Sequence, residues 1–462
     1  MLLKSSIDNI KKLVKSGNVL TSDEERYCYA QDSTNIKEAV NMPDAVVFVE
    51  SVEDVQRVLV YANKNRIPVI SRGAGTNMVG ACTCPKGGIV MNFSKMNKIL
   101  DFSPENMSMR VQPGAVLSDI KSLAESKGLF YPPDPSNFKV STIGGSIAQS
   151  SGGAMAFKYG TTKDYITSLT VVLADGTLMK LGAGTVKDAV GYHLNQLIIG
   201  SEGTLAIVVE AELKLIPKPN CLRTVIGYFD SFDKAVEGVN GIIKEQVFPA
   251  TIDFMDNNSI RTVENFYPTG LKTDMNALLL IDIDGFSSSL EEQQKRVQEA
   301  LMQAGAALID INDGDNIWTA RRSSFAATAQ LAPDVVSDDI IVPRTNLAKM
   351  INACKDICDK YGLKVCIVGH VGDGNIHPQI ALDLENDAEF KNYIKAKSEM
   401  YEMAISLGGT ISAEHGVGAE KISYLDSTLD KNAINFMHQI KKMFDPNNIL
   451  NPDKIFRMQE EL

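Results

Sequence analysis

The strongest local constraint on the fold is a ten-residue segment that holds two of only five histidines in 462 residues. Residues 369–378 read Gly-His-Val-Gly-Asp-Gly-Asn-Ile-His-Pro. His370 and His377 cannot share a face of one straight strand, because side chains alternate with period two. The glycines and the asparagine between them disfavour a helix. The segment therefore predicts a turn at Gly-Asp-Gly-Asn that folds two extended stretches together and brings both imidazoles close.

A carboxylate and a further histidine follow about forty residues later as Glu414-His415-Gly416. Two imidazoles and one carboxylate are a ligand set for a catalytic divalent metal with open positions. We therefore predict a site with ligands His370, His377 and Glu414 that holds Zn, Fe or Mn. His415 would then remain as an unliganded base beside the metal. The alternative is a polar hairpin whose histidines are only hydrogen-bonded.

Composition narrows the class of protein. The chain has 46 basic and 57 acidic residues, a net charge of -11, which argues against a nucleic-acid-binding surface. Its seven cysteines are scattered without a Cys-x-x-Cys pair, which predicts a reduced, cytoplasmic protein without an iron–sulfur cluster. Residues 2–12 predict a short amphipathic helix rather than a signal peptide, and no apolar run is long enough to span a membrane.

The order of predicted elements indicates at least two domains. Residues 45–70 predict a β-α-β unit that leads into a glycine-rich loop at 72–80, and the spacing of its glycines does not fit a nicotinamide fingerprint. Such a loop can bind an anion through its backbone N–H groups, although a plain loop is equally compatible. Residues 141–154 are mostly glycine or small and polar, and they have few large side chains to pack with. We therefore predict that a large planar ligand lies against the backbone of this stretch. After a Pro-Lys-Pro boundary at 217–219, alternating strands and helices predict an α+β layer with helices on one face.

Several separated motifs occur in one characteristic order. They are Arg-Gly-Ala-Gly-Thr at 72–76, Pro-Pro-Asp-Pro at 132–135, Thr-Ile-Gly-Gly at 142–145, Gly-Ser-Glu-Gly-Thr-Leu at 200–205, the histidine segment at 369–377, Glu-His-Gly-Val-Gly at 414–418, and Asp-Pro-Asn-Asn-Ile-Leu-Asn-Pro at 445–452. Together they resemble the FAD-linked 2-hydroxyacid dehydrogenases, a family that includes glycolate oxidases, D-lactate dehydrogenases and D-2-hydroxyglutarate dehydrogenase. The resemblance covers essentially the whole chain.

The resemblance implies an α+β protein with a vanillyl-alcohol-oxidase-type FAD-binding domain at 1–218, an α+β cap domain at 219–420 that holds substrate and metal, and a C-terminal helical segment at 421–462 that returns to the FAD domain. It also implies which residues contact FAD: Ser71, Gly73, Ala74, Gly75, Thr76, Asn77, Pro133, Thr142, Gly144, Gly145, Ala148, Ser151, Gly152, Gly153, Glu202, Gly203, Ile207 and Asn451. Some relatives tether the flavin through a histidine in the first glycine loop. This loop contains none, so we expect non-covalent FAD.

The predicted reaction is dehydrogenation of a 2-hydroxy acid. His415 is the expected general base, because histidine is the side chain whose ordinary pKa lies nearest neutrality. Arg321 is the expected partner of the substrate carboxylate, with Arg322 as the competitor one residue away. Relatives that act on longer dicarboxylates carry a lysine just before a strand that ends in Val-Pro, whereas residues 335–339 here read Val-Val-Ser-Asp-Asp. The sequence therefore favours D-lactate or glycolate over 2-hydroxyglutarate.

The electrons must leave the flavin through another molecule. The length and motifs resemble the catalytic subunits of bacterial electron-bifurcating lactate dehydrogenases, which implies an electron-transfer flavoprotein as the partner. Alternatives are a glycolate or D-2-hydroxyglutarate dehydrogenase with another acceptor, and a non-catalytic electron-carrier subunit. A metal-dependent hydrolase with the same ligands is a further alternative, but it leaves residues 1–217 without a role.

Overall fold

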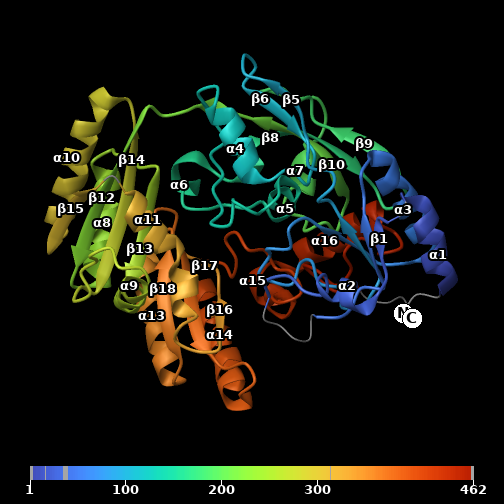
Figure 1. The fold of residues 1–462 in the computed structure, drawn as a ribbon. Coiled ribbons are helices and arrows are strands. Elements are labelled where there is room, and N and C mark those ends of the chain that lie inside the picture. Colours follow the sequence, from blue (N-terminus) through green and yellow to red (C-terminus); the bar gives the residue numbers. More distant parts are fainter. Residues whose placement is uncertain (1–3, 16, 35–39, 313, 459–462) are drawn as a thin grey trace. The chain divides into compact units, whose positions relative to one another are not determined.

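The computed structural model describes residues 4–15, 17–34, 40–312 and 314–458 (Figure 1). Contacts divide the chain into two compact units. The first unit comprises Met1–Ser151, Thr161–Lys218 and Glu414–Leu462, and the second comprises Gly152–Gly160 and Pro219–Ala413. This division shares the break after Lys218 with the predicted domain bounds. It differs in returning to the first unit at Glu414 rather than at residue 421, and in assigning residues 152–160 to the second unit.

The first unit begins with a four-stranded sheet in the order β1-β2-β4-β3. β2 and β3 both pair in parallel with β4, and helix α3 connects them. Ser51 starts α3 because its side chain accepts a hydrogen bond from the N–H of Asp54 at 3.2 Å. Val55, Val58 and Leu59 of α3 are buried against the sheet. The bounds are β1 Val19–Leu20, β2 Ala45–Phe48, α3 Val52–Asn65, β3 Val69–Arg72 and β4 Ile89–Asn92.

A five-stranded antiparallel sheet completes the first unit, in the order β5-β6-β10-β8-β9. Its β8–β9 pair is a hairpin around the Asp-Gly sequence at 175–176, a dipeptide that favours such turns. Along β10 every second residue is buried, as expected for a strand with one face on the core. The bounds are β5 Ile99–Ser103, β6 Ser108–Val111, β8 Ile166–Val172, β9 Leu178–Leu181 and β10 Ile207–Lys214.

The remaining elements of the first unit are short, except for the terminal helices. Leu2 and Leu3 of the predicted N-terminal helix lie outside the described residues. The C-terminal segment returns to the four-stranded sheet, where Asn451 N–H donates to the Val69 carbonyl at 2.8 Å. The bounds are α1 Lys4–Leu13, α2 Asp23–Tyr27, α4 Leu117–Glu125, β7 Leu129–Phe130, α5 Ile143–Gln149, η2 Thr162–Tyr165, α7 Leu194–Ile198, β11 Ile216–Pro217, η4 Ile422–Tyr424, α15 Leu425–Thr428 and α16 Lys431–Phe444.

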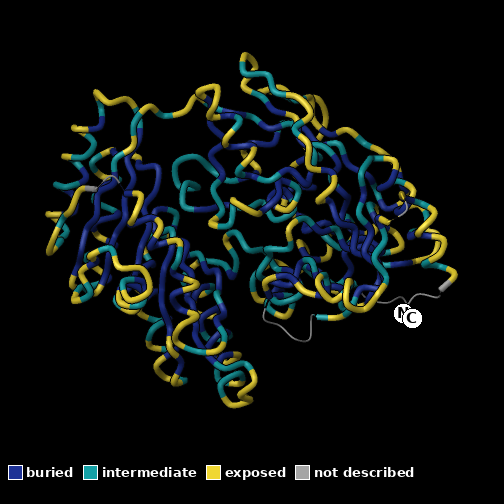
Figure 2. The backbone as a smooth tube through the Cα atoms, in the orientation of Figure 1, coloured by how far each residue is buried: buried dark blue, intermediate teal, exposed yellow. Residues whose placement is uncertain are grey.

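An eight-stranded antiparallel sheet forms the centre of the second unit, in the order β15-β12-β14-β13-β18-β19-β16, with β17 paired to β19. Figure 2 shows that its inner strands are buried along most of their length. The strand bounds are β12 Cys221–Phe229, β13 Thr251–Asp256, β14 Ala277–Gly285, β15 Leu308–Asn312, β16 Asp334–Ser337, β17 Ile340–Ile341, β18 Lys364–Gly369 and β19 Asn375–Leu382.

Helices cover both faces of this sheet, so the prediction of helices on one face is wrong. On one face, Gly227 of β12 and Leu279 of β14 lie against α8 and α10. On the other face, Leu278 and Leu280 of β14 pack with Trp318 of α11 and with α9. The helix bounds are α6 Ala156–Tyr159, α8 Phe232–Lys244, α9 Asn257–Phe266, α10 Ser287–Gln303, α11 Asp315–Arg322, α12 Ser324–Thr328, η3 Arg344–Asn346, α13 Leu347–Lys360 and α14 Asp387–Ser406.

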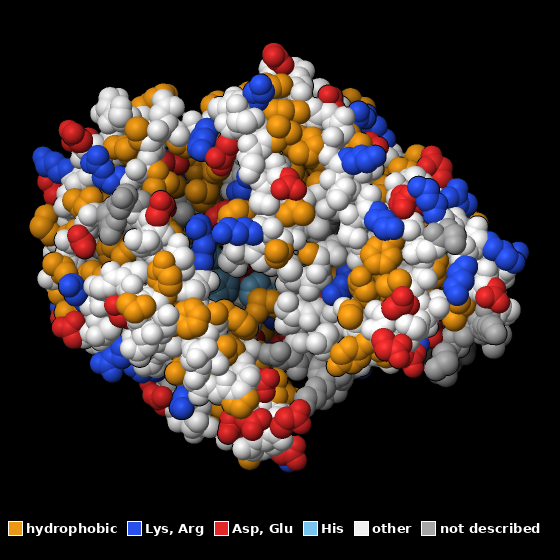
Figure 3. Space-filling model, viewed as in Figure 1, with side chains coloured by type: hydrophobic (Ala, Val, Ile, Leu, Met, Phe, Trp, Pro, Cys, Tyr) orange, Lys and Arg blue, Asp and Glu red, His pale blue; other side chains and the backbone are white. Residues whose placement is uncertain are grey.

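The surface mixes charges of both signs. On the face shown in Figure 3, basic and acidic side chains are interspersed rather than gathered by sign. Within the part of the chain that the structure describes, no helix combines the length and the apolar character needed to cross a membrane.

Candidate active site

The first wall of a pocket in the first unit is the loop at the end of β3, residues 71–77. Gly75 has φ +73°, a conformation that residues with a side chain rarely adopt. A Cβ on Gly73 would lie 2.2 Å from Oγ1 of Thr142, far inside van der Waals contact. The loop backbone therefore approaches residue 142 at a distance that only glycine permits.

The second wall is α5, which forms half of the stretch 141–154 of mainly small and polar residues. Thr142 caps this helix, and its side-chain oxygen accepts a hydrogen bond from Gly145 N–H at 3.4 Å. A Cβ on Gly144 would lie 2.7 Å from Cβ of Pro113, so this glycine lets the helix pack closely on the loop before α4. Part of the stretch 141–154, which we predicted to lie against a planar ligand, is thus a helix that packs closely on its neighbours.

The third wall contains Glu202, a buried carboxylate in the left-handed conformation, with φ 52°. Its two oxygens accept hydrogen bonds from the N–H groups of Val417 at 2.7 Å and Gly418 at 2.8 Å. Burial raises the pKa of Glu202 to about 7, and these two bonds partly oppose the increase. Glu202 therefore ties the Glu-His-Gly motif at 414–416 to the pocket wall through the two residues that follow it.

Most of the residues predicted to contact FAD line this one pocket. They are Ser71, Gly73, Ala74, Gly75, Thr76, Asn77, Thr142, Gly144, Gly145, Ala148, Ser151, Glu202, Gly203 and Ile207. They come from three separate stretches of the sequence, and the fold of the first unit brings them together.

Four of the predicted contact residues lie elsewhere. Pro133 is buried away from the pocket lining, and Gly152 and Gly153 belong to the second unit. Asn451 is 2% exposed, and its side chain donates to the carbonyls of Ala81 at 2.9 Å and of Glu202 at 2.6 Å. Asn451 thus supports the pocket wall from behind instead of facing the pocket.

Other lining residues were not predicted. Arg72 and Gln149 lie inside motifs that the sequence analysis singled out, so their position next to the glycines was an available signal. Cys82, Phe93 and Ile198 also line the pocket, and nothing in their local sequence distinguishes them from core residues.

Glu414 and His415 line the same pocket of the first unit. The His415 carbonyl accepts a hydrogen bond from Asn77 Nδ2 at 3.2 Å. Gly416 has φ +86°, and a Cβ there would lie 2.4 Å from Gln149 Oε1 and 2.6 Å from Glu202 Oε1. The Glu-His-Gly motif is therefore fixed against all three walls, and it places an imidazole at a pocket lined largely by glycine backbone.

The histidine segment of the second unit forms the predicted hairpin. β18 and β19 pair antiparallel, with Val368 opposite His377. The rings of His370 and His377 lie edge to face, with their centroids 5.2 Å apart. At the turn, Gly374 has φ +92°, and a Cβ there would lie 2.2 Å from the Val342 carbonyl oxygen. The prediction that both imidazoles converge is confirmed.

A buried aspartate accompanies His370. Asp253 of β13 is 1% exposed, and its Oδ2 lies 3.3 Å from His370 Nδ1. Its Oδ1 accepts a hydrogen bond from Arg321 Nε at 2.9 Å and forms an ion pair with Arg321 Nη2 at 2.9 Å. Burial opposes ionisation of Asp253, but Arg321 and His370 together hold its pKa below the ordinary value. Asp253 thus connects Arg321 of α11 with His370 at the end of β18.

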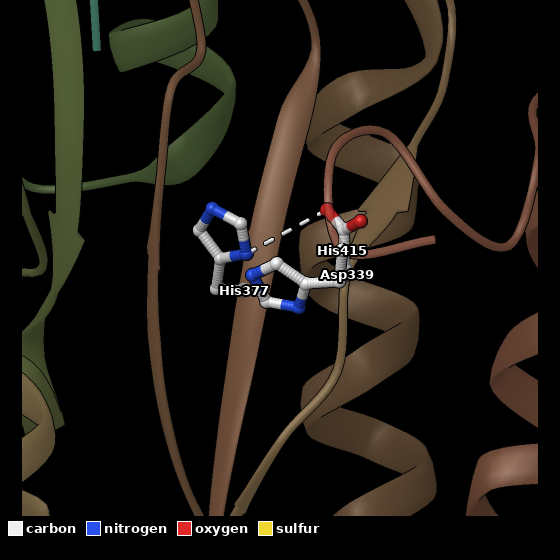
Figure 4. A group of neighbouring side chains, drawn as sticks. All are labelled: Asp339, His377 and His415. Carbon is white, nitrogen blue, oxygen red and sulfur yellow. Dashed lines mark ion pairs between the residues drawn. The ribbon is translucent and has the colours of Figure 1, made fainter. Parts of the chain in front are cut away.

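A second buried aspartate accompanies His377. Asp339 is 0% exposed, and its Oδ1 lies 3.8 Å from His377 Nδ1, the ion pair dashed in Figure 4, which also draws His415. Asn375 Nδ2 donates to Oδ1 at 2.8 Å. Ser412 Oγ and Ala413 N–H both donate to Oδ2 at 2.8 Å. Asp339 therefore anchors the two residues that directly precede Glu414 in the chain.

The two candidate arginines differ in environment. Arg321 is 8% exposed and is held by Asp253 and by Ser324 Oγ, which accepts from Nη1 at 3.4 Å. Arg322 is exposed, and its guanidinium lies 5.6 Å from the centre of the Trp318 ring. Arg321 is thus the one of the two that shares a carboxylate with a hairpin histidine.

Asp338, the acid next to Asp339, turns toward a different set of groups. Its Oδ1 accepts a hydrogen bond from Tyr401 OH at 2.6 Å and lies 3.7 Å from Nζ of the buried Lys397. We expected Asp338 and Asp339 together to disfavour a second substrate carboxylate, but the two side chains have different partners. Asp338 pairs with α14, and Asp339 lies beside His377.

Two protein families match the sequence of this chain. The family described as "FAD binding domain" matches residues 43–182, and the family described as "FAD linked oxidases, C-terminal domain" matches residues 218–455. The chain is 40% identical over 461 residues to the glycolate oxidase subunit GlcD of Bacillus subtilis (strain 168), covering 99% of this chain and 97% of the relative. It is 35% identical to the D-lactate dehydrogenase of Anaerostipes hadrus, covering 97% and 96% of the two chains.

Solved structures agree on the fold. The chain matches p-cresol methylhydroxylase with a TM-score of 0.83 at 17% identity, covering 99% of this chain and 98% of that one. It matches the 4-ethylphenol oxidase of Gulosibacter chungangensis with a TM-score of 0.79 at 18% identity, covering 99% and 97%. At these identities the likeness concerns the fold alone, which is of the vanillyl-alcohol-oxidase type.

The match of residues 43–182 to an FAD-binding family gives the N-terminal part of the chain a role that the hydrolase alternative did not. The two matches cover two of the three pocket walls and the histidine hairpin. Together with relatives that align over nearly their whole length, they show that this chain belongs to the FAD-linked 2-hydroxyacid dehydrogenase family.

Proposed function

We propose that the chain oxidises a small 2-hydroxy acid, D-lactate in the first place, to the 2-oxo acid with FAD as the electron acceptor. The observation that carries the proposal is the position of His415 on the wall of the glycine-lined pocket. The chain enters this pocket directly after Ala413, which is bound to Asp339, the aspartate beside His377. Residues 413–415 therefore place the proposed metal ligand Glu414 and the proposed base His415 directly after the contact with Asp339.

The pocket fits a flavin by the chemistry of its walls. Gly73, Gly144 and Gly203 all line the pocket, so the walls there present backbone N–H groups that can bind the phosphates and polar edges of FAD. A Cβ at any of the three would meet protein atoms at 2.2–2.7 Å, so only glycine lets these walls pack together. Bound FAD would supply the acceptor for the hydride, with its two electrons, that leaves C2 of the hydroxy acid. Within the proposal, His415 takes the hydroxyl proton at one of its ring nitrogens.

The hairpin fits a divalent cation by the arrangement of its donors. His370 Nδ1 lies 3.3 Å from the buried Asp253 and His377 Nδ1 lies 3.8 Å from the buried Asp339, so each ring has a carboxylate beside Nδ1 and can offer Nε2 to a metal. We propose His370, His377 and Glu414 as ligands of Zn, Fe or Mn. Such a cation would polarise the substrate hydroxyl and fix its orientation.

Arg321 is the proposed partner of the substrate carboxylate. A guanidinium has five N–H donors, and Asp253 and Ser324 engage three of those of Arg321. The end of the guanidinium can therefore still pair with a carboxylate while Asp253 holds the other side. This would fix the substrate relative to His370 through a shared aspartate.

The substrate is the first test of the proposal. Under anaerobic conditions we expect D-lactate to bleach the flavin absorbance fastest, glycolate more slowly, and L-lactate and D-2-hydroxyglutarate least. A single methyl in an apolar pocket contributes about 1–3 kcal/mol, so D-lactate should exceed glycolate by roughly tenfold or more in the second-order rate. Glycolate is the second candidate because the 40%-identical relative is named a glycolate oxidase subunit. Bleaching by none of the four acids would overturn the proposal.

Substitution Gly416→Ala should weaken FAD binding. The added Cβ would overlap Gln149 Oε1 and Glu202 Oε1, and overpacking of this kind costs about 1–3 kcal/mol. We expect the FAD dissociation constant to rise roughly ten- to hundredfold, measured by flavin fluorescence during dilution. Gly128→Ala is the control, because Gly128 has a similar φ of +71° but nothing within 4 Å of its Cβ position. Equal FAD affinity of the two variants would contradict the proposed role of the Glu-His-Gly motif.

The proposed electron acceptor is an electron-transfer flavoprotein, in a cytoplasmic complex. The absence of a Cys-x-x-Cys pair from the sequence supports transfer from FAD to an external carrier. All seven cysteines are free, which supports a reducing compartment.

A further inference from the structure

The second unit contains two buried aspartates that the proposed reaction leaves without a chemical step. Asp253 lies on β13, and Asp339 lies between β16 and β17, so the two come from different parts of the sheet. Oδ2 of Asp253 lies 3.3 Å from Nδ1 of His370, within hydrogen-bond reach, and Oδ1 of Asp339 lies 3.8 Å from Nδ1 of His377, beyond a direct hydrogen bond in this structure. Both are almost fully buried, at 1% and 0% exposed.

Both aspartates are already engaged by groups of the protein, which argues against either as a metal ligand itself. Asp339 accepts hydrogen bonds from Asn375 Nδ2, Ser412 Oγ and Ala413 N–H. Oδ1, the oxygen that accepts from Asn375 Nδ2, is also the one nearest to His377 Nδ1. Oδ1 of Asp253 is likewise engaged, by Arg321 and by Phe254 N–H at 2.7 Å, which leaves Oδ2 for His370.

The chemistry of the pairs determines the histidine tautomer. An ionised carboxylate can only accept hydrogen bonds, so a ring nitrogen that forms a hydrogen bond with it must carry the proton. With Nδ1 protonated, Nε2 of the neutral imidazole carries the lone pair that a metal can accept. Carboxylates behind metal-ligating histidines fix the ring orientation in this way and raise the basicity of the ligand.

We infer that Asp253 and Asp339 are positioning residues for a divalent cation: each holds one hairpin histidine in the Nδ1–H tautomer with Nε2 available as ligand. The inference rests on the metal site of the proposed function and deepens it. Each aspartate also holds a second group. Asp253 holds Arg321, and Asp339 holds the segment 412–413 that precedes Glu414. The same two carboxylates therefore connect the hairpin with the predicted substrate arginine and with the chain that delivers the third ligand.

The test is the Zn²⁺ affinity of the FAD-loaded protein with the substitutions Asp253→Asn and Asp339→Asn. Asparagine keeps the shape of aspartate, but its amide can donate to Nδ1 and shift the ring proton to Nε2. We expect each substitution to raise the Zn²⁺ dissociation constant about 10- to 100-fold, measured by competition with a chelating dye. The matched control is Asp282→Asn, because Asp282 is a buried carboxylate of the same sheet whose side chain accepts from Thr224 Oγ1 at 2.6 Å. This control should leave the Zn²⁺ affinity unchanged.

A second measurement needs no variant and covers the case in which one of them fails to fold. Nitrogen-15 chemical shifts of the metal-free protein report which ring nitrogen of each histidine carries the proton. We expect His370 and His377 to be protonated at Nδ1, and Nε2–H tautomers would overturn the inference. If Zn²⁺ binds the unsubstituted protein and is lost on His377→Ala, but binds both aspartate variants as well as the control, only the inference fails. If the unsubstituted protein binds no Zn²⁺, the proposed metal site fails together with it.

Discussion

Replacing His415 with alanine should slow reduction of the flavin by D-lactate about 10²- to 10⁴-fold, which is the usual contribution of a positioned general base. The bound FAD should remain, because His415 contributes its backbone carbonyl to the contact with Asn77 and alanine keeps that carbonyl. Anaerobic stopped-flow absorbance measures the rate, and the flavin-to-protein ratio measures retention. Free imidazole should restore part of the rate, since it can fill the space of the missing side chain and accept the same proton.

The control for this experiment is His193→Ala. His193 is an exposed histidine of the first unit that precedes α7 and does not line the pocket. Flavin reduction in this variant should match the unsubstituted protein. A His415→Ala enzyme that reduces its flavin at the original rate would show that another group takes the proton, and the role of His415 would have to be abandoned.

Removal of one metal ligand should have an effect of similar size. We expect His377→Ala to lose its bound divalent metal and to reduce flavin at least about 10²-fold more slowly, which corresponds to roughly 3 kcal/mol of transition-state stabilisation. Elemental analysis gives the metal content independently of activity. Chelator treatment of the unsubstituted protein should reproduce the loss, and added metal should reverse it there but not in the variant.

His438→Ala is the control for the metal experiment. His438 lies on α16, where its ring packs on Phe456 with centroids 4.3 Å apart. Its removal should change neither metal content nor flavin reduction. Full metal occupancy in His377→Ala, or full activity of a metal-free enzyme, would contradict the assignment of the hairpin as a metal site.

The hairpin shows what local sequence can predict. The spacing of His370 and His377 and the glycines between them excluded a helix and a single strand, and the turn that remained is the observed one. This worked because turn-forming residues act on their immediate neighbours. The β8–β9 hairpin around an Asp-Gly turn was predictable for the same reason.

The helix α5 shows why other elements could not be predicted. Gly144 and Gly145 have poor helix propensity, so residues 141–154 gave no helical pattern. In the structure the absence of a Cβ on Gly144 allows contact with Pro113, and this tertiary contact outweighs the propensity. The second helix layer of the large sheet did have a local signal. Ala277–Ile281 of β14 is continuously apolar, which is the pattern of a strand buried on both faces.

The positioning aspartates lie beyond sequence reasoning of this kind. Asp253 lies far from His370 in the chain, and the antiparallel pairing of β13 with β18 brings their elements side by side. The assignment of residues 152–160 to the second unit has the same origin. Lys158 and Tyr159 both bind Asp284, and Phe157 lies against Gly372. Such contacts depend on which strands are neighbours in the sheet, and local patterns do not encode that order.

The central claim is that a flavin bound in the pocket beside His415 accepts electrons from a 2-hydroxy acid. The most direct measurement is the absorbance spectrum of the purified protein before and after anaerobic addition of D-lactate. The account predicts a flavin spectrum at about one FAD per chain that bleaches within the time of mixing. A fully folded, colourless protein without extractable flavin would contradict the account, as would a flavin spectrum that D-lactate and glycolate both leave unchanged.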